Sequence, residues 1–246
     1  AARRRRRLLW CAGAAAATAV VSMAVAVASL NPSVAAEPTA PPQVAADPAG
    51  VSDPSPGPSP STGTGDDPLT PGEVGKARAA ALTTSLAESG RDVTGGKGPE
   101  YLSSEVVEGG TGRDVQVYYY DYQTDELVKQ VVDVNSGKVT GSFRGKGLQR
   151  PASDREVATA VDLLLAAPAG ADVRALYTKV TGQPWSGKDK LQVGAHIFHA
   201  RPADTAVRQC GQHRCVQLVA RVANGPFVDL NNIIIDLSGR SVARVK

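Results

Sequence analysis

Cysteine, methionine, histidine and aromatic residues are scarce in this chain of 246 residues. It contains three Cys, one Met and three His, and aromatic residues make up 4% of the total. Several common motifs are missing too, since the sequence has no G-x-S-x-G, P-loop, H-E-x-x-H or G-x-G-x-x-G. The sequence therefore lacks the usual signatures of serine hydrolases, P-loop enzymes, zinc proteases and dinucleotide-binding enzymes. We therefore expect a protein that is not an enzyme and needs no cofactor.

Acidic residues are absent from the first 36 positions, which form a segment of their own. A run of arginines from Arg3 to Arg7 precedes residues 8–30, which are uncharged and rich in Ala and Val. Small residues follow up to Ala36, and this order predicts an export signal cleaved near Ala36. The residues that fit a twin-arginine signal are Arg5, Arg6, Leu8 and Leu9. If the segment is retained, its uncharged stretch is long enough to act as a membrane anchor.

The positive net charge of the chain comes from this predicted signal. The whole sequence carries 27 Lys and Arg against 24 Asp and Glu, which gives a formal charge of +3. Without residues 1–36, 22 basic and 24 acidic residues remain. The net charge therefore gives no reason to expect nucleic-acid binding.

Residues 37–68 read as a disordered linker rich in Pro, Ser and Ala. Nine of these residues are Pro, and all five charged residues are acidic. Such a composition has no apolar face to bury, so we expect an extended and mobile segment. It would serve as a spacer or as a tether in the cell envelope.

The remaining sequence predicts two similar lobes, residues 69–150 and 151–246, each an α+β unit. Each lobe begins with a capping box, Thr70 with Glu73 and Ser153 with Glu156. The first box starts a helix whose apolar residues extend to Leu86. The first lobe then has expected strands at 101–107, 113–122, 126–134 and 139–143. The second lobe has expected helices from Ser153 to Pro168 and at 171–180, and strands at 191–200, 214–223, 227–237 and 241–246.

The two lobes end in similar sequences. VVDVNSGKVTGSF (131–143) and IIIDLSGRSVARV (233–245) share an apolar run, an Asp, a Ser-Gly turn, a basic residue and a closing strand. Together with the repeated capping box, this favours an internal duplication. We expect each lobe to pack its helix against one face of a curved antiparallel β-meander.

These patterns carry a resemblance to known families. The first lobe, with its helix and the D-x-x-x-G-x-V motif of Asp133, Gly137 and Val139, resembles PepSY domains of secreted or membrane-attached bacterial proteins. The second lobe, from SDREVATAVDLLLA to NNIIIDLSGRSVARV, resembles the small N-terminal α+β domains of copper amine oxidases. The whole chain is similar to secreted proteins of actinomycetes that carry twin-arginine signals.

The copper amine oxidase resemblance covers the non-catalytic part of those enzymes. Their quinone cofactor forms from a Tyr in an Asn-Tyr-Asp/Glu setting, whereas Tyr120 here follows another Tyr. Their copper is held by a His-x-His pair and a distant His, whereas His196 and His199 are separated by two residues. The resemblance therefore implies neither the cofactor nor the copper site.

The stretch CGQHRC, at 210–215, concentrates side chains that can bind a metal ion or react as nucleophiles. Three interpretations are open for it: a metal site with His196, His199 and His213, a redox thiol pair, or a disulfide between Cys210 and Cys215. On a strand, His196 and His199 would point to opposite faces, with His199 partly buried at the strand end. Four residues between the cysteines is unlike the Cys-x-x-Cys of redox thiols and allows a turn that brings the two together. A disulfide is the favoured interpretation, and we expect no metal.

The YYYDY run at 118–122 gives a second candidate. Alternation along a strand sends Tyr118, Tyr120 and Tyr122 to one face, where rigid rings with polar tips suit a binding surface. The competing interpretation is that these rings pack against other parts of the chain.

The sequence as a whole predicts an exported binding or inhibitory module outside the cytoplasmic membrane. Its expected partner is an extracellular protein or a component of the cell envelope, with the membrane involved only through an uncleaved signal. Two alternatives are an amine-oxidase-associated or copper- or zinc-handling protein and a structural protein of the envelope.

Overall fold

The computed structural model describes residues 62–110 and 112–245. The predicted export signal, with Arg5, Arg6, Leu8, Leu9 and the cleavage point near Ala36, lies outside the described residues. The same holds for residues 37–61 of the predicted linker. No helix in the described part combines the length and the apolar character needed to cross a membrane.

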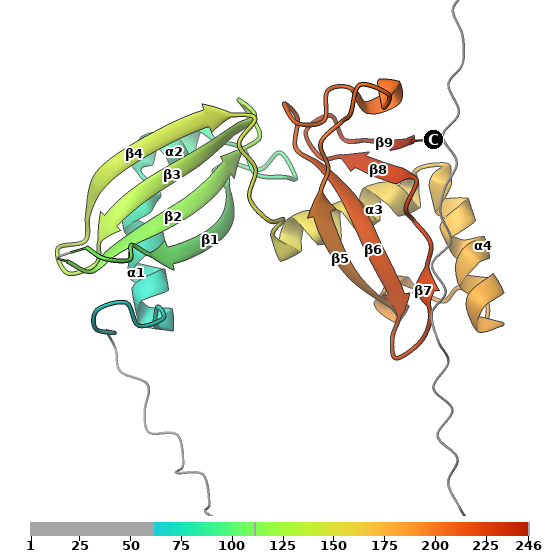
Figure 1. Ribbon diagram of the computed structural model, residues 1–246, viewed down its shortest axis with the longest axis horizontal. Coiled ribbons are helices and arrows are strands. Elements are labelled where there is room, and N and C mark those ends of the chain that lie inside the picture. Colours follow the sequence, from blue (N-terminus) through green and yellow to red (C-terminus); the bar gives the residue numbers. More distant parts are fainter. Residues whose placement is uncertain (1–61, 111, 246) are drawn as a thin grey trace, which may run out of the picture. The chain divides into compact units, whose positions relative to one another are not determined.

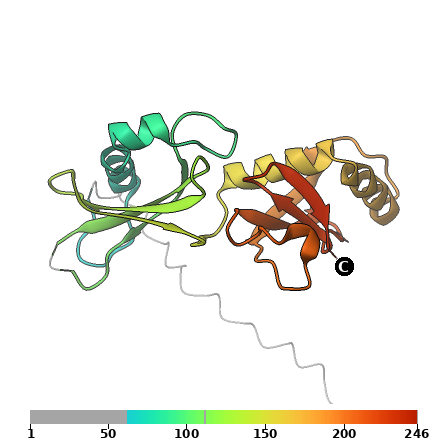
Figure 2. The ribbon, with the colours of Figure 1, turned by 90° about the horizontal axis from the view of Figure 1, so that it is seen from above.

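The fold is α+β, as the sequence predicts, with helices and two antiparallel sheets (Figure 1). In the first half, residues 62–150, the elements are α1 (Pro71–Ala81), α2 (Thr84–Ser89), β1 (Glu100–Val106), β2 (Asp114–Asp121), β3 (Glu126–Asp133) and β4 (Lys138–Lys146). The four strands form a meander in the order β1-β2-β3-β4. Figure 2 shows α1 and α2 on the same side of this sheet, and we call the other side its outer face.

The second half, residues 151–245, repeats this order with additions. Its elements are α3 (Asp154–Ala166), α4 (Ala169–Thr181), the 3-10 helix η1 (Lys188–Lys190), β5 (Leu191–Ile197), the 3-10 helix η2 (Thr205–Val207), β6 (Cys215–Val222), β7 (Phe227–Val228), β8 (Ile233–Asp236) and β9 (Ser241–Arg244). The sheet order is β5-β6-β8-β9, and β7 pairs with β6. Each sheet has its own apolar core, packed against α1 and α2 in the first half and against α3 and α4 in the second.

Two expected elements are interrupted in the structure. The first helix ends at Ala81, and α2 starts separately because the Thr83 hydroxyl accepts a hydrogen bond from the Leu86 amide. The expected strand at 227–237 is two short strands, since the Asp229 carboxylate accepts the Asn231 amide and turns the chain between them.

A buried ion pair clamps the start of the first half. Glu73 completes the predicted capping box, and its carboxylate also binds Arg113, with Nε at 2.8 Å from Oε1. Arg113 donates further hydrogen bonds to the carbonyl oxygens of Gly65 and Asp67. Residues 62–68 are therefore held against the sheet, and the folded part begins earlier than residue 69. The Arg113 guanidinium lowers the pKa of Glu73 from 4.5 to about 2, against the opposing effect of burial.

The same clamp occurs in the second half. Glu156 completes the other predicted capping box and binds Arg214, with Nε at 2.5 Å from Oε1, and both side chains are fully buried. Arg214 also donates to the carbonyl oxygens of Arg150 and Pro151. Arg113 and Arg214 each immediately precede a central strand, β2 or β6. This correspondence supports the duplication predicted from the sequence.

Candidate functional site

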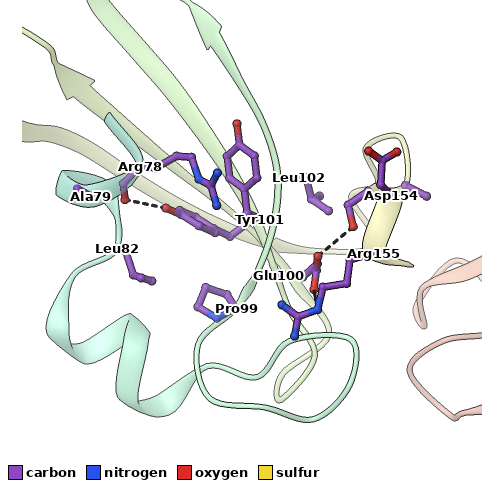
Figure 3. Close-up of a pocket in the computed structure, with 12 residues that line it drawn as sticks. Arg78, Ala79, Leu82, Pro99, Glu100, Tyr101, Leu102, Asp154 and Arg155 are labelled. Carbon is purple, nitrogen blue, oxygen red and sulfur yellow. Dashed lines mark hydrogen bonds and ion pairs between the residues drawn. The ribbon is translucent and has the colours of Figure 1, made fainter. Parts of the chain in front are cut away.

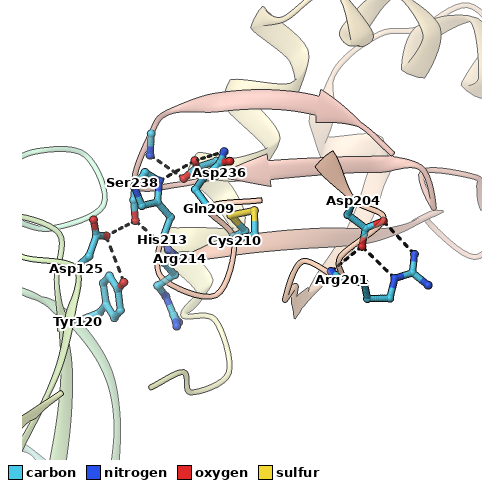
Figure 4. Close-up of a disulfide and its surroundings, with 12 residues drawn as sticks. Tyr120, Asp125, Arg201, Asp204, Gln209, Cys210, His213, Arg214, Asp236 and Ser238 are labelled. Carbon is cyan, nitrogen blue, oxygen red and sulfur yellow. Dashed lines mark hydrogen bonds and ion pairs between the residues drawn. A yellow bond between two sulfur atoms is a disulfide. The ribbon is translucent and has the colours of Figure 1, made fainter. Parts of the chain in front are cut away.

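Cys210 and Cys215 form a disulfide, as predicted, with their Cα atoms 5.4 Å apart (Figure 4). Cys215 begins β6, and Cys210 follows η2, so the bond ties residues 198–214 to the sheet. Both cysteines are buried in a small apolar cluster with Val207 and Ile234. The disulfide is thus part of a packed core.

Replacing both cysteines with serine is expected to lower the free energy of unfolding by about 2 kcal/mol, because the unfolded chain regains the freedom that this small ring removes. Urea denaturation of the oxidised chain and the double variant measures the difference. Wild-type chain treated with a reductant should match the variant. Equal midpoints for the oxidised and reduced chain would contradict the prediction.

The three candidate histidines do not converge on one point. His213 Nδ1 lies 2.9 Å from Asp236 Oδ2 at the disulfide loop, and His196 is exposed on β5. His199 is exposed, so its expected partial burial is wrong; β5 ends at Ile197, and His199 lies in the following loop. In residues 62–110 and 112–245 no group of three or more His, Cys, Asp or Glu is placed to hold a metal ion.

The prediction that Tyr118, Tyr120 and Tyr122 form an exposed binding face is wrong. Tyr120 is fully buried, and its hydroxyl donates to Asp125 Oδ1 at 3.3 Å. Tyr122 donates to Glu156 Oε1 at 2.6 Å, so it contacts the second half, and burial raises its pKa well above the usual value. These rings instead pack against other parts of the chain, which is the competing interpretation. The sequence could not decide between the two, because the alternation of a strand shows which residues share a face but not what covers that face.

A hollow of about 620 Å³ lies where α1, β1 and the start of α3 meet (Figure 3). Its walls include apolar side chains from three segments, with the end of α1, the start of β1 and the residues before α3 each contributing. The apolar and aromatic lining residues are Ala79, Leu82, Pro99, Tyr101, Leu102, Tyr119 and Ala152. Leu82 is among the exposed large apolar side chains of the described residues. The hollow therefore presents an apolar wall to solvent.

Arg78 lies along one wall of the hollow, over an aromatic ring. Its guanidinium carbon is 3.8 Å from the centre of the Tyr101 ring, a cation–π contact. The Tyr119 hydroxyl donates to the Arg78 carbonyl oxygen at 3.0 Å and fixes the backbone there. Within the described part of the chain, Arg78 has no acidic side chain within ion-pair distance. Its positive charge is thus oriented and free of a partner carboxylate.

Arg155 and Glu100 form the other wall. Glu100 is only 4% exposed, accepts a 2.9 Å hydrogen bond from Ser153 Oγ, and lies 3.8 Å from Arg155 Nε. Arg155 also binds Asp92, in the turn before β1. Burial raises the pKa of Glu100, as does the nearby Glu156 carboxylate, while the Ser153 hydrogen bond opposes them.

The hollow is chemically suited to holding a ligand. Arg78 places a guanidinium without an ion pair in the described residues beside an apolar and aromatic wall, whereas Arg155 is bound to Asp92 and Glu100; the Arg78 side therefore matches a ligand with an acidic group beside an apolar one. Its lining contains neither His nor Cys, and the Ser153 hydroxyl is engaged with Glu100 and as the cap of α3. Sequence reasoning missed this site, because the recognised motifs that reach it, the second capping box and the YYYDY run, give no sign that α1 and the start of β1 lie beside them.

Comparison with known proteins gives matches among solved structures. No protein-family model matches the chain, and no curated protein sequence matches it. Among solved structures, a copper-containing benzylamine oxidase from Hansenula polymorpha is similar over 73% of this chain, with 13% sequence identity and a TM-score of 0.39. The chain covers 29% of that protein, well under two thirds of its length. At this TM-score the likeness says nothing about activity.

Proposed function

We propose that the chain is an exported, non-catalytic binding module that holds an acidic, partly apolar ligand in the hollow of Figure 3. The observation that carries the proposal is Arg78, an oriented cation without a partner carboxylate in the described chain, above the exposed apolar wall. The fitting ligand class is a segment of an extracellular protein with an acidic side chain next to an apolar one. The disulfide is compatible with export, since such bonds persist in oxidising compartments.

Binding of a fluorescently labelled Leu-Glu dipeptide, which is too short to add a strand to a sheet, to the purified full chain tests this proposal. Replacing Arg78 with glutamine is expected to weaken binding about tenfold, because a charge-assisted contact to the carboxylate is lost. The matched control is Arg221→Gln, since Arg221 is exposed on β6 with no ion pair in the described residues. Affinity should also fall with added salt.

Two results would overturn this function. Equal affinities of the Arg78→Gln and wild-type chains would remove the hollow as the binding site. Stoichiometric copper or zinc in the purified chain, lost with His213→Ala, would instead support the metal-handling alternative.

A further inference from the structure

The two sheets can be compared position by position. Asp133 ends β3 and Asp236 ends β8, and in each case the next residue donates its amide to the carbonyl oxygen of the clamp arginine, Arg113 or Arg214. Val131 and Ile234 each lie two residues before these aspartates and therefore correspond. Both belong to the outer faces of their sheets, because their neighbours along the strand face the helices.

The second half covers its own outer face. The connection from β5 to β6, residues 198–214, contributes Phe198, Val207 and Cys210 to the apolar cluster around Ile234. Ile234 is fully buried as a result. The disulfide holds this cover against the sheet.

Within the described residues, the first half has no equivalent cover over β4, although Tyr118 and Tyr120 on the same outer face are buried. Its connection from β1 to β2 comprises residues 107–113, which is ten residues shorter than the matching connection of the second half. Phe143 on β4 is 56% exposed, and Leu148, just after β4, is 55% exposed. An apolar surface that the second half buries is thus open to solvent in the first.

This open surface is positively charged. Lys129 lies with Nζ 4.6 Å from the centre of the Phe143 ring, and Lys138 at the start of β4 shares this face because a β-bulge separates it from Phe143. Neither lysine has an ion pair within the described residues. We call Lys129, Lys138, Phe143 and Leu148 the β4 surface.

The backbone of β4 is available as well. This strand of nine residues is an edge of its sheet, so one row of its amide and carbonyl groups faces no neighbouring strand. Gly141 and Gly145 lie on the same face as Phe143, where the Phe143 ring packs over Gly141 and Leu148 packs over Gly145. An antiparallel pairing of two copies centred on Ser142 would place Lys138 opposite Lys146, and the like charges disfavour it.

We propose that the β4 surface docks an extended acidic segment of another protein, which adds a strand to β4 and packs an apolar side chain on Phe143. Acidic side chains of the added strand neutralise Lys129 and Lys138, and backbone hydrogen bonds satisfy the free edge. The site is separate from the hollow and is an additional protein-binding surface.

The test uses the full chain and the fluorescent peptide Glu-Thr-Glu-Thr-Val-Thr-Glu-Thr-Glu, whose acidic side chains and central valine share one face of a strand. Phe143→Thr, and separately the charge-reversed chain with Lys129→Glu and Lys138→Glu, are each expected to weaken binding at least tenfold. The control is Phe227→Thr, because Phe227 is 65% exposed on β7 in the second half. A peptide with N-methyl groups on alternate amides should not bind, since it cannot pair with an edge strand.

Four results would overturn the proposal. Undiminished binding of the N-methylated peptide would exclude strand addition, and equal losses with Phe227→Thr would exclude this surface. A dimer abolished by Phe143→Thr would show that a second copy is the occupant. Tighter peptide binding by a chain lacking residues 37–61 would assign the surface to the chain's own acidic segment. Arg78→Gln should leave this binding unchanged, so failure here and failure at the hollow are distinguishable.

Discussion

Replacing Glu156 with alanine is expected to lower the free energy of unfolding by about 3–5 kcal/mol, the usual cost of leaving one charge of a buried pair without its partner. Arg214 is fully buried and donates hydrogen bonds to both carboxylate oxygens of Glu156. The substitution also removes the acceptor of the Tyr122 hydroxyl and half of the capping box of α3. Urea denaturation of the two chains gives the difference.

A double variant separates the charge effect from the loss of packing. Adding Arg214→Leu to Glu156→Met removes both charges, so it should cost less than the sum of the two single substitutions. The control is Glu126→Ala, whose partner Arg144 is 40% exposed, and a loss below about 1 kcal/mol is expected there. A loss below 1 kcal/mol for Glu156→Ala would contradict the prediction.

Replacing Arg113 with methionine is expected to destabilise the chain strongly at pH 7 and much less at pH 3. In the wild type the pKa of Glu73 is lowered from 4.5 to about 2, chiefly by Arg113. The folded state therefore gains stability from this group above about pH 4.5 and loses it as the pH falls toward 2. Without Arg113, burial opposes ionisation of Glu73 with its main counterweight removed, so acid removes less stability through this carboxyl.

Urea midpoints of both chains at pH 3, 5 and 7 measure this effect. The control is Arg201→Met, because Arg201 pairs with Asp204 but is 71% exposed, so solvent screens the pair. A difference between wild type and Arg113→Met that stays constant over this pH range would show that Glu73 is not the titrating partner.

The elements that obey local rules could be predicted from the sequence. Capping boxes place a hydroxyl and a carboxyl three residues apart, so the starts of α1 and α3 follow from Thr70, Glu73, Ser153 and Glu156. The disulfide is equally local, since the four residues between its cysteines turn the chain. The break before α2 also has a local signal, Thr83, which an apolar stripe running on to Leu86 conceals.

The features that bring distant residues together could not be predicted. Glu73 lies 40 residues from Arg113 and Glu156 lies 58 from Arg214, and no spacing rule links them. The burial of Tyr120 and the exposure of Phe143 have the same origin. Both lie on outer faces, and what covers an outer face depends on the path of other segments.

The hollow could not be predicted from the sequence for a related reason. Arg78, Glu100 and Arg155 come from three different elements. In the sequence, each of them looks like an ordinary polar residue on a solvated helix face or at the end of a strand. Only packing brings these elements together and leaves an apolar gap between them.

The hydrogen bonds of Arg214 determine how the junction between the two halves can unfold. The Arg214 guanidinium holds Gln149, Arg150 and Pro151, the residues that join the two halves of the chain, as well as the first turn of α3. Detaching this joint would leave a desolvated cation without acceptors, and the helix would lose its cap in the same step. Release of the joint and fraying of α3 are therefore a single cooperative event, so the junction behaves as one of the last parts of the molecule to come apart.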